Sequence, residues 1–292
     1  MNRWIIGARP RTLPAAVVPV AVGTGAAVGQ SPSGIIWWRV AAAGVVALAL
    51  QIGTNYANDY SDGVKGTDSQ RVGPVRLVAS GLASAKAVKG AAFGAFGIAA
   101  IVGLALALAA GPWLILVGAA AIAAGWFYTG GPRPYGYAGF GELFVFVFFG
   151  LVATAGTTYV LLERFTGLAL AVSVPVGFLA CALLVVNNLR DIPTDTQAGK
   201  RTLAVRIGDG ATRLLYVCLI GGAGVLILVI ALVTGRQGIA TGAMGPLIVG
   251  MPPQQAVMRQ AKGRDLIPVL GGTGKVQLAT GLLLTLGLAF SA

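Results

Sequence analysis

The sequence predicts an all-α polytopic membrane protein with nine transmembrane helices. Hydrophobic residues make up 56% of the 292 residues and charged residues only 10%, whereas a soluble domain carries about 25% charged residues. Long charge-free runs recur along the chain, and most of them approach or exceed the roughly 20 residues that one membrane helix needs. The basic residues are concentrated between these runs, on alternating connections. We expect residues 1–292 to form a single transmembrane domain.

The expected helices follow from the charge-free runs. The run at 90–132 is long enough for two spans, and Gly111-Pro112-Trp113 divides it. The eighth helix contains Gly250-Met251-Pro252-Pro253, so a half-helix is an alternative there. In chain order, the helices are expected at 12–30, 40–58, two within 90–132, 143–162, 165–189, 214–235, 237–258 and 276–292.

The distribution of Lys and Arg predicts the orientation in the membrane. With nine spans, 18 of the 21 basic residues lie on one face, and only Arg39, Arg164 and Arg236 lie on the other. Because basic loops stay in the cytoplasm, we expect a cell-membrane protein whose N-terminus and active site are cytoplasmic and whose C-terminus is outside. The net charge of +12 is spread over these loops, where it favours contact with membrane lipid and argues against a nucleic-acid partner.

The residue types limit the chemistry. The chain has no histidine, which excludes His-based triads and histidine-ligated metals. Cys181 and Cys218 both lie inside apolar runs, so we expect them to be inert.

Five of the nine acidic residues form two clusters on the predicted cytoplasmic face. The first cluster is NYANDYSDGVKGTD at 55–68, and the second begins NNLRDIPTDTQAGKR at 187–201. Helical spacing places the Asn and the first two Asp residues of each cluster on one face, provided that the second helix tolerates Pro193. The residues are Asn55, Asp59, Asp62 and the looser Asp68, and Asn187, Asp191 and Asp195.

Clustered carboxylates repel one another unless cations bind, and oxygen ligands select Mg²⁺ over Zn²⁺. The two clusters therefore indicate a diphosphate that Mg²⁺, as two bridging ions, holds against the protein. The basic residues expected to neutralise phosphate charge are Lys65, Arg71, Arg76, Lys200 and Arg201. The competing interpretation, that these acids only balance nearby Lys and Arg, explains the two similar clusters less well.

The two motifs, their separation and the opening ARPRTLPAAVVPVAVG resemble the UbiA superfamily of intramembrane aromatic prenyltransferases. RVGPVRLVASG after the first motif and YTGGPRPYGYAGFGEL at 128–143 resemble the branch that prenylates 1,4-dihydroxy-2-naphthoate in menaquinone synthesis. The resemblance implies a UbiA-type helix bundle and Mg²⁺-dependent ionisation of a polyprenyl diphosphate. Attack by the naphthoate, with loss of CO₂ and diphosphate, would give demethylmenaquinone. A related acceptor such as 4-hydroxybenzoate is the alternative.

The resemblance also implies roles for individual residues. Asp59, Asp62, Asp191 and Asp195 are the expected catalytic residues, with Asp68 and Asn187 as further Mg²⁺ ligands and Asn55, Asn58 and Asn188 as substrate-binding residues. Tyr128 and Tyr135 would stabilise a carbocation or flank the ring, unless they are interfacial belt aromatics. We expect Arg71, Arg76 or Arg133 to hold the acceptor carboxylate.

Two other classes share part of this pattern. A nine-span transporter would usually place ionisable groups or broken helices near the bilayer midplane, whereas these carboxylates lie at helix ends. A CDP-alcohol phosphotransferase also combines Asp with Mg²⁺, but its acids form one compact run.

Overall fold

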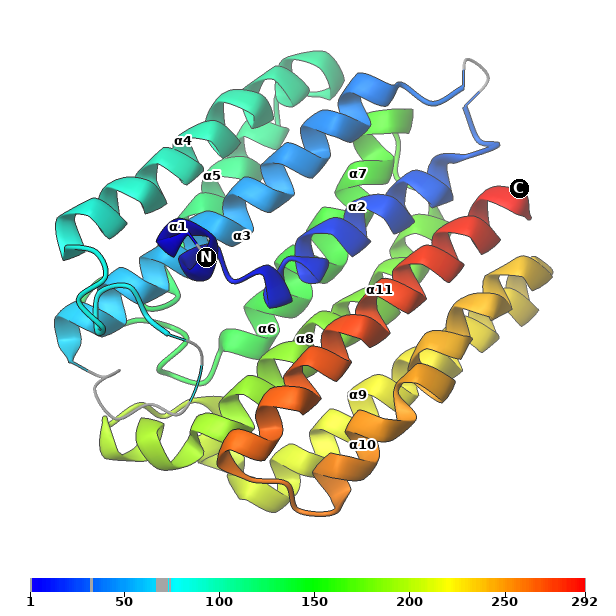
Figure 1. Cartoon of the computed structure of the whole chain (residues 1–292). Helices are drawn as coiled ribbons and strands as arrows, with labels where there is room; N and C mark the ends of the chain where they lie inside the picture. Colours follow the sequence, from blue (N-terminus) through cyan, green and yellow to red (C-terminus); the bar gives the residue numbers. More distant parts are fainter. Residues whose placement is uncertain (1, 32–33, 67–72, 74, 292) are drawn as a thin grey trace.

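The computed structural model describes residues 2–31, 34–66, 73, 75–291 and leaves residues 1, 32–33, 67–72, 74 and 292 undescribed. The described residues form helices and connections, without a β-strand. The helices run roughly parallel or antiparallel to one another in an elongated bundle (Figure 1). The predicted all-α class is therefore confirmed.

Long apolar helices build the bundle. Their bounds are α3 (Trp37–Lys65), α4 (Ala85–Ala110), α8 (Gly167–Gln197), α9 (Leu203–Thr234) and α11 (Leu266–Phe290). The shorter helices are α1 (Arg3–Ala8), η1 (Pro10–Thr12), α2 (Pro14–Ala27), α5 (Leu114–Phe127), α6 (Gly141–Val145), the π-helical η2 (Phe146–Val152), α7 (Ala153–Leu162), η3 (Gln237–Ala243), η4 (Gly245–Val249), α10 (Met251–Met258) and η5 (Gly263–Asp265).

The count of nine transmembrane helices is not confirmed. Among the described residues, six helices are long and apolar enough to cross a membrane, and a seventh results if the segments Arg3–Thr12 and Pro14–Ala27, bent by 52°, are one span. Helix α5 has only 14 residues. The run at 237–258 is divided into η3, η4 and α10, the interruption that its Gly and Pro residues predict.

Several helices extend further at the polar end than the charge-free runs predict. α3 continues to Lys65, so Asp59 and Asp62 lie in its last two turns. α8 passes through Pro193 and ends at Gln197. α9 begins at Leu203 and is kinked at Gly208, and α11 begins at Leu266. Charged side chains at the membrane interface do not end a helix, because they reach water from its last turns.

Close helix contacts depend on small residues. A Cβ atom added to Gly150 of η2 would lie 2.6 Å from the Cα atom of Gly177 on α8. Only glycine at this crossing allows the two backbones to approach so closely. The contact places η2 directly against α8, and Phe148 and Phe149 of η2 line a central cavity.

Candidate active site

A cavity of about 840 Å³ runs between α2, α3, α5, η2, α7 and α8. Its wall is polar at one end only, where the ends of α3 and α8 meet the N-terminal segment and the loops between helices. The polar residues at that end are Arg9, Asn55, Asn58, Asp62, Arg76, Asn187, Asn188, Asp191, Asp195 and Lys200. The rest of the wall is mainly apolar. Both predicted motifs therefore meet at one site.

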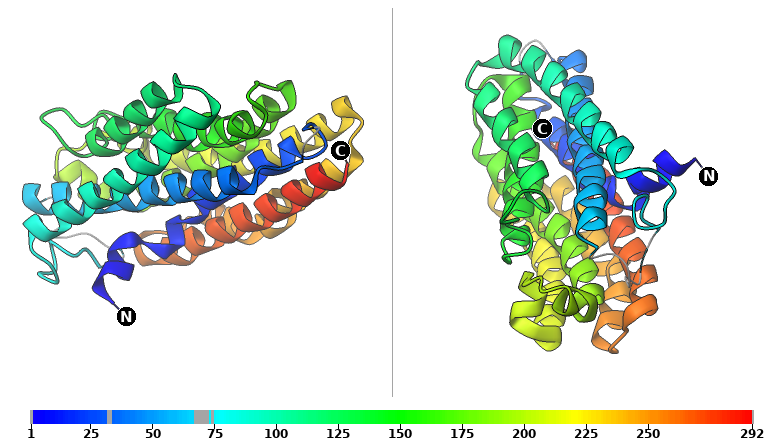
Figure 2. Two further views of the ribbon diagram at one scale, coloured as in Figure 1. Left: turned by 90° about the horizontal axis from the view of Figure 1, so that it is seen from above. Right: turned by 90° about the vertical axis from the view of Figure 1, so that its left-hand side faces the viewer.

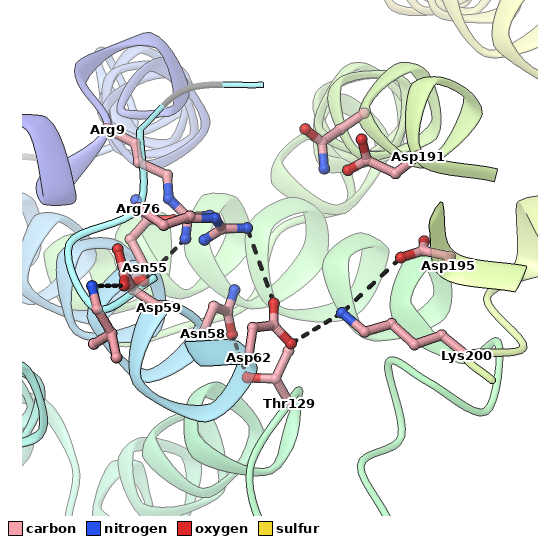
Figure 3. A network of polar contacts seen from close by, with 12 residues as sticks. Arg9, Asn55, Asn58, Asp59, Asp62, Arg76, Thr129, Asp191, Asp195 and Lys200 are labelled. Carbon is pink, nitrogen blue, oxygen red and sulfur yellow. Dashed lines mark hydrogen bonds and ion pairs between the residues drawn. The ribbon is translucent and has the colours of Figure 1, made fainter. Parts of the chain in front are cut away.

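Asp62 and Lys200 join the two motifs. Lys200 Nζ donates to Asp62 Oδ1 over 2.9 Å and lies 3.9 Å from Asp195 Oδ1 (Figure 3). Arg76 Nη2 lies 3.9 Å from Asp62 Oδ2, and the Tyr137 phenol also donates to Asp62. Asp62 therefore interacts with three separate segments: the loop after α3 through Arg76, the 128–140 loop through Tyr137, and the α8–α9 connection through Lys200.

Asp59, predicted as a metal ligand, is turned toward the loop after α3. Its two carboxylate oxygens accept hydrogen bonds from the backbone N–H groups of Leu77 (2.8 Å) and Val78 (3.0 Å). Asp59 is 1% exposed and is absent from the cavity wall. It fixes the residues directly after Arg76, so it positions that arginine rather than facing the cavity itself.

The asparagines of the first motif fasten neighbouring segments to α3. Asn55 Nδ2 donates to the Ala8 carbonyl (3.0 Å) and to Thr12 Oγ1 (3.1 Å). Asn58 Oδ1 accepts from Thr129 Oγ1 at 2.8 Å. Asn55 and Asn58 both line the cavity while holding the N-terminal segment and the end of α5 in place.

The second motif has a partner that the sequence analysis missed. Arg190 donates to both carboxylate oxygens of Asp191, at 2.7 and 2.8 Å, and to Asn187 Oδ1 at 2.8 Å. Its side chain is only 1% exposed. This bidentate pair fixes the orientation of Asp191 and neutralises its charge. Asn188 instead donates to Glu142 Oε1 at 2.9 Å.

The donor set fits Mg²⁺ held jointly with a phosphate ligand. Among the described residues, no three acidic side chains are close enough to form a metal site by themselves, and Lys200 lies between Asp62 and Asp195. Mg²⁺ usually takes one or two carboxylates and completes its shell with water and substrate phosphate. The carboxylates and amides on the two sides of the cavity meet that requirement.

The other predicted basic residues differ in their placement. Lys65 is exposed and donates to the Thr129 carbonyl at 2.8 Å. Arg201 and Arg133 are exposed and do not line the cavity. Asp68 and Arg71 lie outside the described residues.

Three tyrosines of the 128–140 loop line the cavity. Tyr128 and Tyr135 form an edge-to-face pair with centroids 5.6 Å apart, and Tyr135 stacks on Phe144 at 4.0 Å. Burial raises the pKa of the Tyr128 and Tyr135 phenols, so both stay neutral. Tyr137 was not among the residues predicted from the sequence. The Nζ atoms of Lys65 and Lys200 lie 4.8 and 4.6 Å from the centroid of its ring.

Comparison with known proteins identifies the fold that carries this site. Residues 16–290 match the UbiA prenyltransferase family. The chain belongs to the UbiA prenyltransferase family. Its bundle also superposes on a UbiA homolog from Archaeoglobus fulgidus bound to GPP and Mg²⁺, with a TM-score of 0.69 at 15% identity over 99% of this chain and 98% of the other. The match to an apo UbiA homolog from Aeropyrum pernix has a TM-score of 0.68.

This UbiA prenyltransferase is also similar in sequence to curated relatives. It is 51% identical to the 1,4-dihydroxy-2-naphthoate octaprenyltransferase of Mycobacterium tuberculosis over 99% of this chain and 97% of the relative. It is 34% identical to the protein of the same name from Escherichia coli, over 99% of this chain and 95% of the relative.

Proposed function

We propose that this prenyltransferase transfers a polyprenyl group from polyprenyl diphosphate to 1,4-dihydroxy-2-naphthoate, with Mg²⁺ as cofactor. The products are demethylmenaquinol, which is the reduced form of demethylmenaquinone, together with CO₂ and diphosphate. The observation that carries the proposal is the single cavity that joins a carboxylate-rich and cation-rich end to a long apolar extension. Such a cavity fits a molecule with an anionic head and a hydrocarbon tail. The names of relatives 51% and 34% identical to this chain support the naphthoate as acceptor.

Several residues of the chain would bind the diphosphate and its metal ion, each in a different role. Asp62 on one side, and Asn187, Asp191 and Asp195 on the other, would hold the metal through carboxylate and amide oxygens. Mg²⁺, when bound, supplies positive charge that stabilises the departing diphosphate. Lys200 and Arg76 lie beside Asp62 and add two cations to the same group. Preorganised charge of this kind stabilises the transition state in which the allylic C–O bond breaks.

The carbocation requires a site without nucleophilic side chains. Tyr128 and Tyr135 present neutral aromatic rings at the junction of the polar and apolar parts of the cavity, and such rings stabilise a cation through their faces. The acceptor ring then forms a C–C bond to the prenyl carbon. The bond between the ring and its carboxylate group then breaks, CO₂ leaves, and the electron pair of that bond returns to the ring.

Arg9 is the best placed residue to hold the acceptor carboxylate. It lines the cavity, and its guanidinium points toward the same region as that of Arg76 (Figure 3). Its Nη2 donates to the Asn55 carbonyl at 3.2 Å. No carboxylate in the described part of the chain forms an ion pair with Arg9. Ile6 and Leu270 line the same cavity and offer apolar contacts for an aromatic ring.

The backbone supports a functional role for Arg9. The residue has φ 53° and ψ 71°, in the left-handed region that non-glycine residues rarely adopt. This conformation costs about 1–3 kcal/mol and usually persists where function requires it. It makes the sharp turn between α1 and η1. We propose Arg9 in place of Arg133, which lies outside the cavity.

We further propose that the polar end faces the cytoplasm and that the three weaker apolar segments, α2, α5 and η3–α10, also cross the bilayer. The concentration of Lys and Arg in the connections at the polar end supports this orientation. The three segments lie alongside the long helices in two views of the bundle (Figures 1 and 2). The N-terminus would then be inside and the C-terminus outside.

A reconstituted assay tests the proposed function. Purified protein is incubated with Mg²⁺, an allylic diphosphate and separate aromatic acceptors, and the products are identified by mass. We expect prenylated, decarboxylated naphthoate together with stoichiometric diphosphate. A preference for 4-hydroxybenzoate would overturn the acceptor and leave the reaction type. Absence of diphosphate release with every acceptor would overturn the proposed reaction.

A further inference from the structure

The cavity continues far beyond the diphosphate site. Asp62 and Ala43 both line it and are 19 residues apart on α3. At about 1.5 Å per residue, these positions are about 28 Å apart along the helix. The cavity therefore extends along most of the apolar length of the bundle, from the polar end to the connections at the opposite end.

Trp113 and Phe165 line the far end of this cavity, and Tyr159 packs against both rings; we call these three side chains the aromatic end wall. Trp113 Nε1 donates to Tyr159 OH at 2.9 Å, and their rings are 4.9 Å apart in an edge-to-face arrangement. Phe165 lies 4.8 Å from Tyr159 and 5.8 Å from Trp113. Contacts of this geometry stabilise a fixed cluster.

The end wall is thin and well supported. Trp113 and Phe165 line the cavity, yet they are 39% and 58% exposed, so single side chains separate the inner end of the cavity from the surface. Gly111 packs against Trp113 and Tyr159, because a Cβ atom there would lie 3.0 Å from Trp113 Nε1 and 3.1 Å from Tyr159 OH.

Membrane-interface aromatics are the ordinary explanation for tryptophans at this end, and Trp37 is an example. Trp37 is 70% exposed at the start of α3 and does not line the cavity. Trp113 differs because it contacts the cavity and is held by a hydrogen bond within the cluster. The two residues thus provide a matched pair, one in the wall and one outside it.

We propose that the aromatic end wall determines which prenyl donors this enzyme prefers by limiting how far an extended tail can enter. The inference rests on the proposed function for the identity of the donor. A tail that ends before the wall fits entirely within the cavity. A longer tail has to bend or leave between helices, which weakens its fit. The wall is therefore a specificity element for donor length, remote from the reacting atoms.

A donor-length series tests the proposal by activity. We compare kcat/KM for geranyl, an intermediate and an octaprenyl diphosphate in wild type, Trp113→Ala, Phe165→Ala and the control Trp37→Ala. Removal of a wall ring should raise the octaprenyl-to-geranyl ratio by about tenfold, while Trp37→Ala keeps the wild-type ratio. Because the ratio is taken within one preparation, partial misfolding does not imitate the effect. Unchanged ratios in both wall variants would overturn the proposal.

A binding measurement without acceptor separates this inference from the proposed reaction. Leu114 lines the cavity next to Trp113, whereas Ile115 is 46% exposed and does not line it. Cysteines are placed at each position in a Cys218→Ser background, since Cys218 is exposed and Cys181 is buried. Polyprenyl diphosphates long enough to reach the wall should protect Leu114→Cys from a maleimide. Geranyl diphosphate should not, and Ile115→Cys should react equally with every donor.

The outcomes distinguish the two claims. Protection that depends on length, without naphthoate prenylation, would overturn the proposed function and support the end wall. Naphthoate prenylation with equal protection by all donors would support the proposed function and overturn the end wall. Reaction of Leu114→Cys at the same rate with and without the longest donor would show that the tail does not reach the wall.

Discussion

Lys200 Nζ lies 2.9 Å from Asp62 Oδ1, although the two residues are 138 positions apart in the chain. The contact connects the end of α3 to the connection between α8 and α9. It brings a buried lysine, 8% exposed, to a buried carboxylate, 4% exposed. The two predicted motifs therefore interact through a cation of the protein itself, in addition to any bound metal.

Removal of that cation should weaken donor binding. We expect Lys200→Met to raise KM for the polyprenyl diphosphate by roughly 10- to 150-fold, the equivalent of a charge-assisted hydrogen bond of about 1.5–3 kcal/mol. Lys200→Arg should recover part of the loss. Exposed Lys86 at the start of α4 provides the control Lys86→Met. Equal donor KM values for Lys200→Met and Lys86→Met would contradict the assignment.

Asp59 and Asp62 should fail in different ways when changed to Asn. Asp62→Asn should lower kcat about 100-fold or more, while the hydrogen bonds from the Leu77 and Val78 amides to Asp59 remain. Asp59→Asn loses one acceptor for the Leu77 and Val78 amides, so these amides should exchange hydrogen faster and activity should fall through displacement of Arg76. Hydrogen-exchange mass spectrometry of this segment distinguishes the two. Wild-type exchange in Asp59→Asn would argue against a positioning role.

Arg9→Gln should separate acceptor binding from donor binding. Loss of the guanidinium should raise KM for the naphthoate roughly 10- to 150-fold and change KM for the donor much less. Arg133→Gln serves as the matched control, because Arg133 is exposed and outside the cavity. Steady-state kinetics with each substrate varied in turn gives both constants. A larger effect on the donor than on the naphthoate would place Arg9 at the diphosphate instead.

Chelation of Mg²⁺ should abolish turnover without unfolding the protein. Asp62 is paired with Lys200, and Asp191 is paired with Arg190, so the charges at the site are balanced within the chain. We expect excess EDTA to eliminate diphosphate release and to shift Tm by less than about 2 °C. Re-addition of Mg²⁺ should restore activity. A large loss of thermal stability in EDTA would instead indicate a structural metal.

The proposed topology predicts opposite locations for two reporters. A reporter that is active only in the cytoplasm should work when inserted in the segment between Lys65 and Arg76 and fail when fused to the C-terminus. The reverse result would overturn the orientation. Activity at both sites would mean that an even number of spans separates them, and α5 or the broken segment η3–α10 would then be the first to remove from the count.

The sequence allowed the general arrangement of this fold to be predicted, because charge-free runs identify membrane helices directly. It also placed both Asp motifs at the same end of the bundle, and residues of both motifs line one cavity. Helix ends were less accessible to prediction. α9 begins at Leu203 rather than 214, because Arg206, Asp209 and Arg213 lie within the helix near the interface, where charge is tolerated.

The spacing of residues in the sequence also could not predict which way each carboxylate points. With 3.6 residues per turn, Asn55 and Asp62 point almost the same way, whereas Asp59 is about 40–60° from each. That difference suffices for Asp59 to face the loop at Leu77 and not the cavity. Partners distant in sequence, such as Lys200 for Asp62, follow from the packing of α3 against the α8–α9 connection and not from any local pattern.

The fastening of the N-terminal segment to α3 has a practical consequence for work with this enzyme. Tyr56 OH donates to the Trp4 carbonyl at 2.8 Å, and Asn55 binds Ala8 and Thr12, so residues 4–12 act as part of the site wall. A bulky fusion or a truncation there would strain the substrate cavity directly. The end of α11 lies at the opposite end of the bundle (Figure 1). An affinity tag therefore belongs after Phe290.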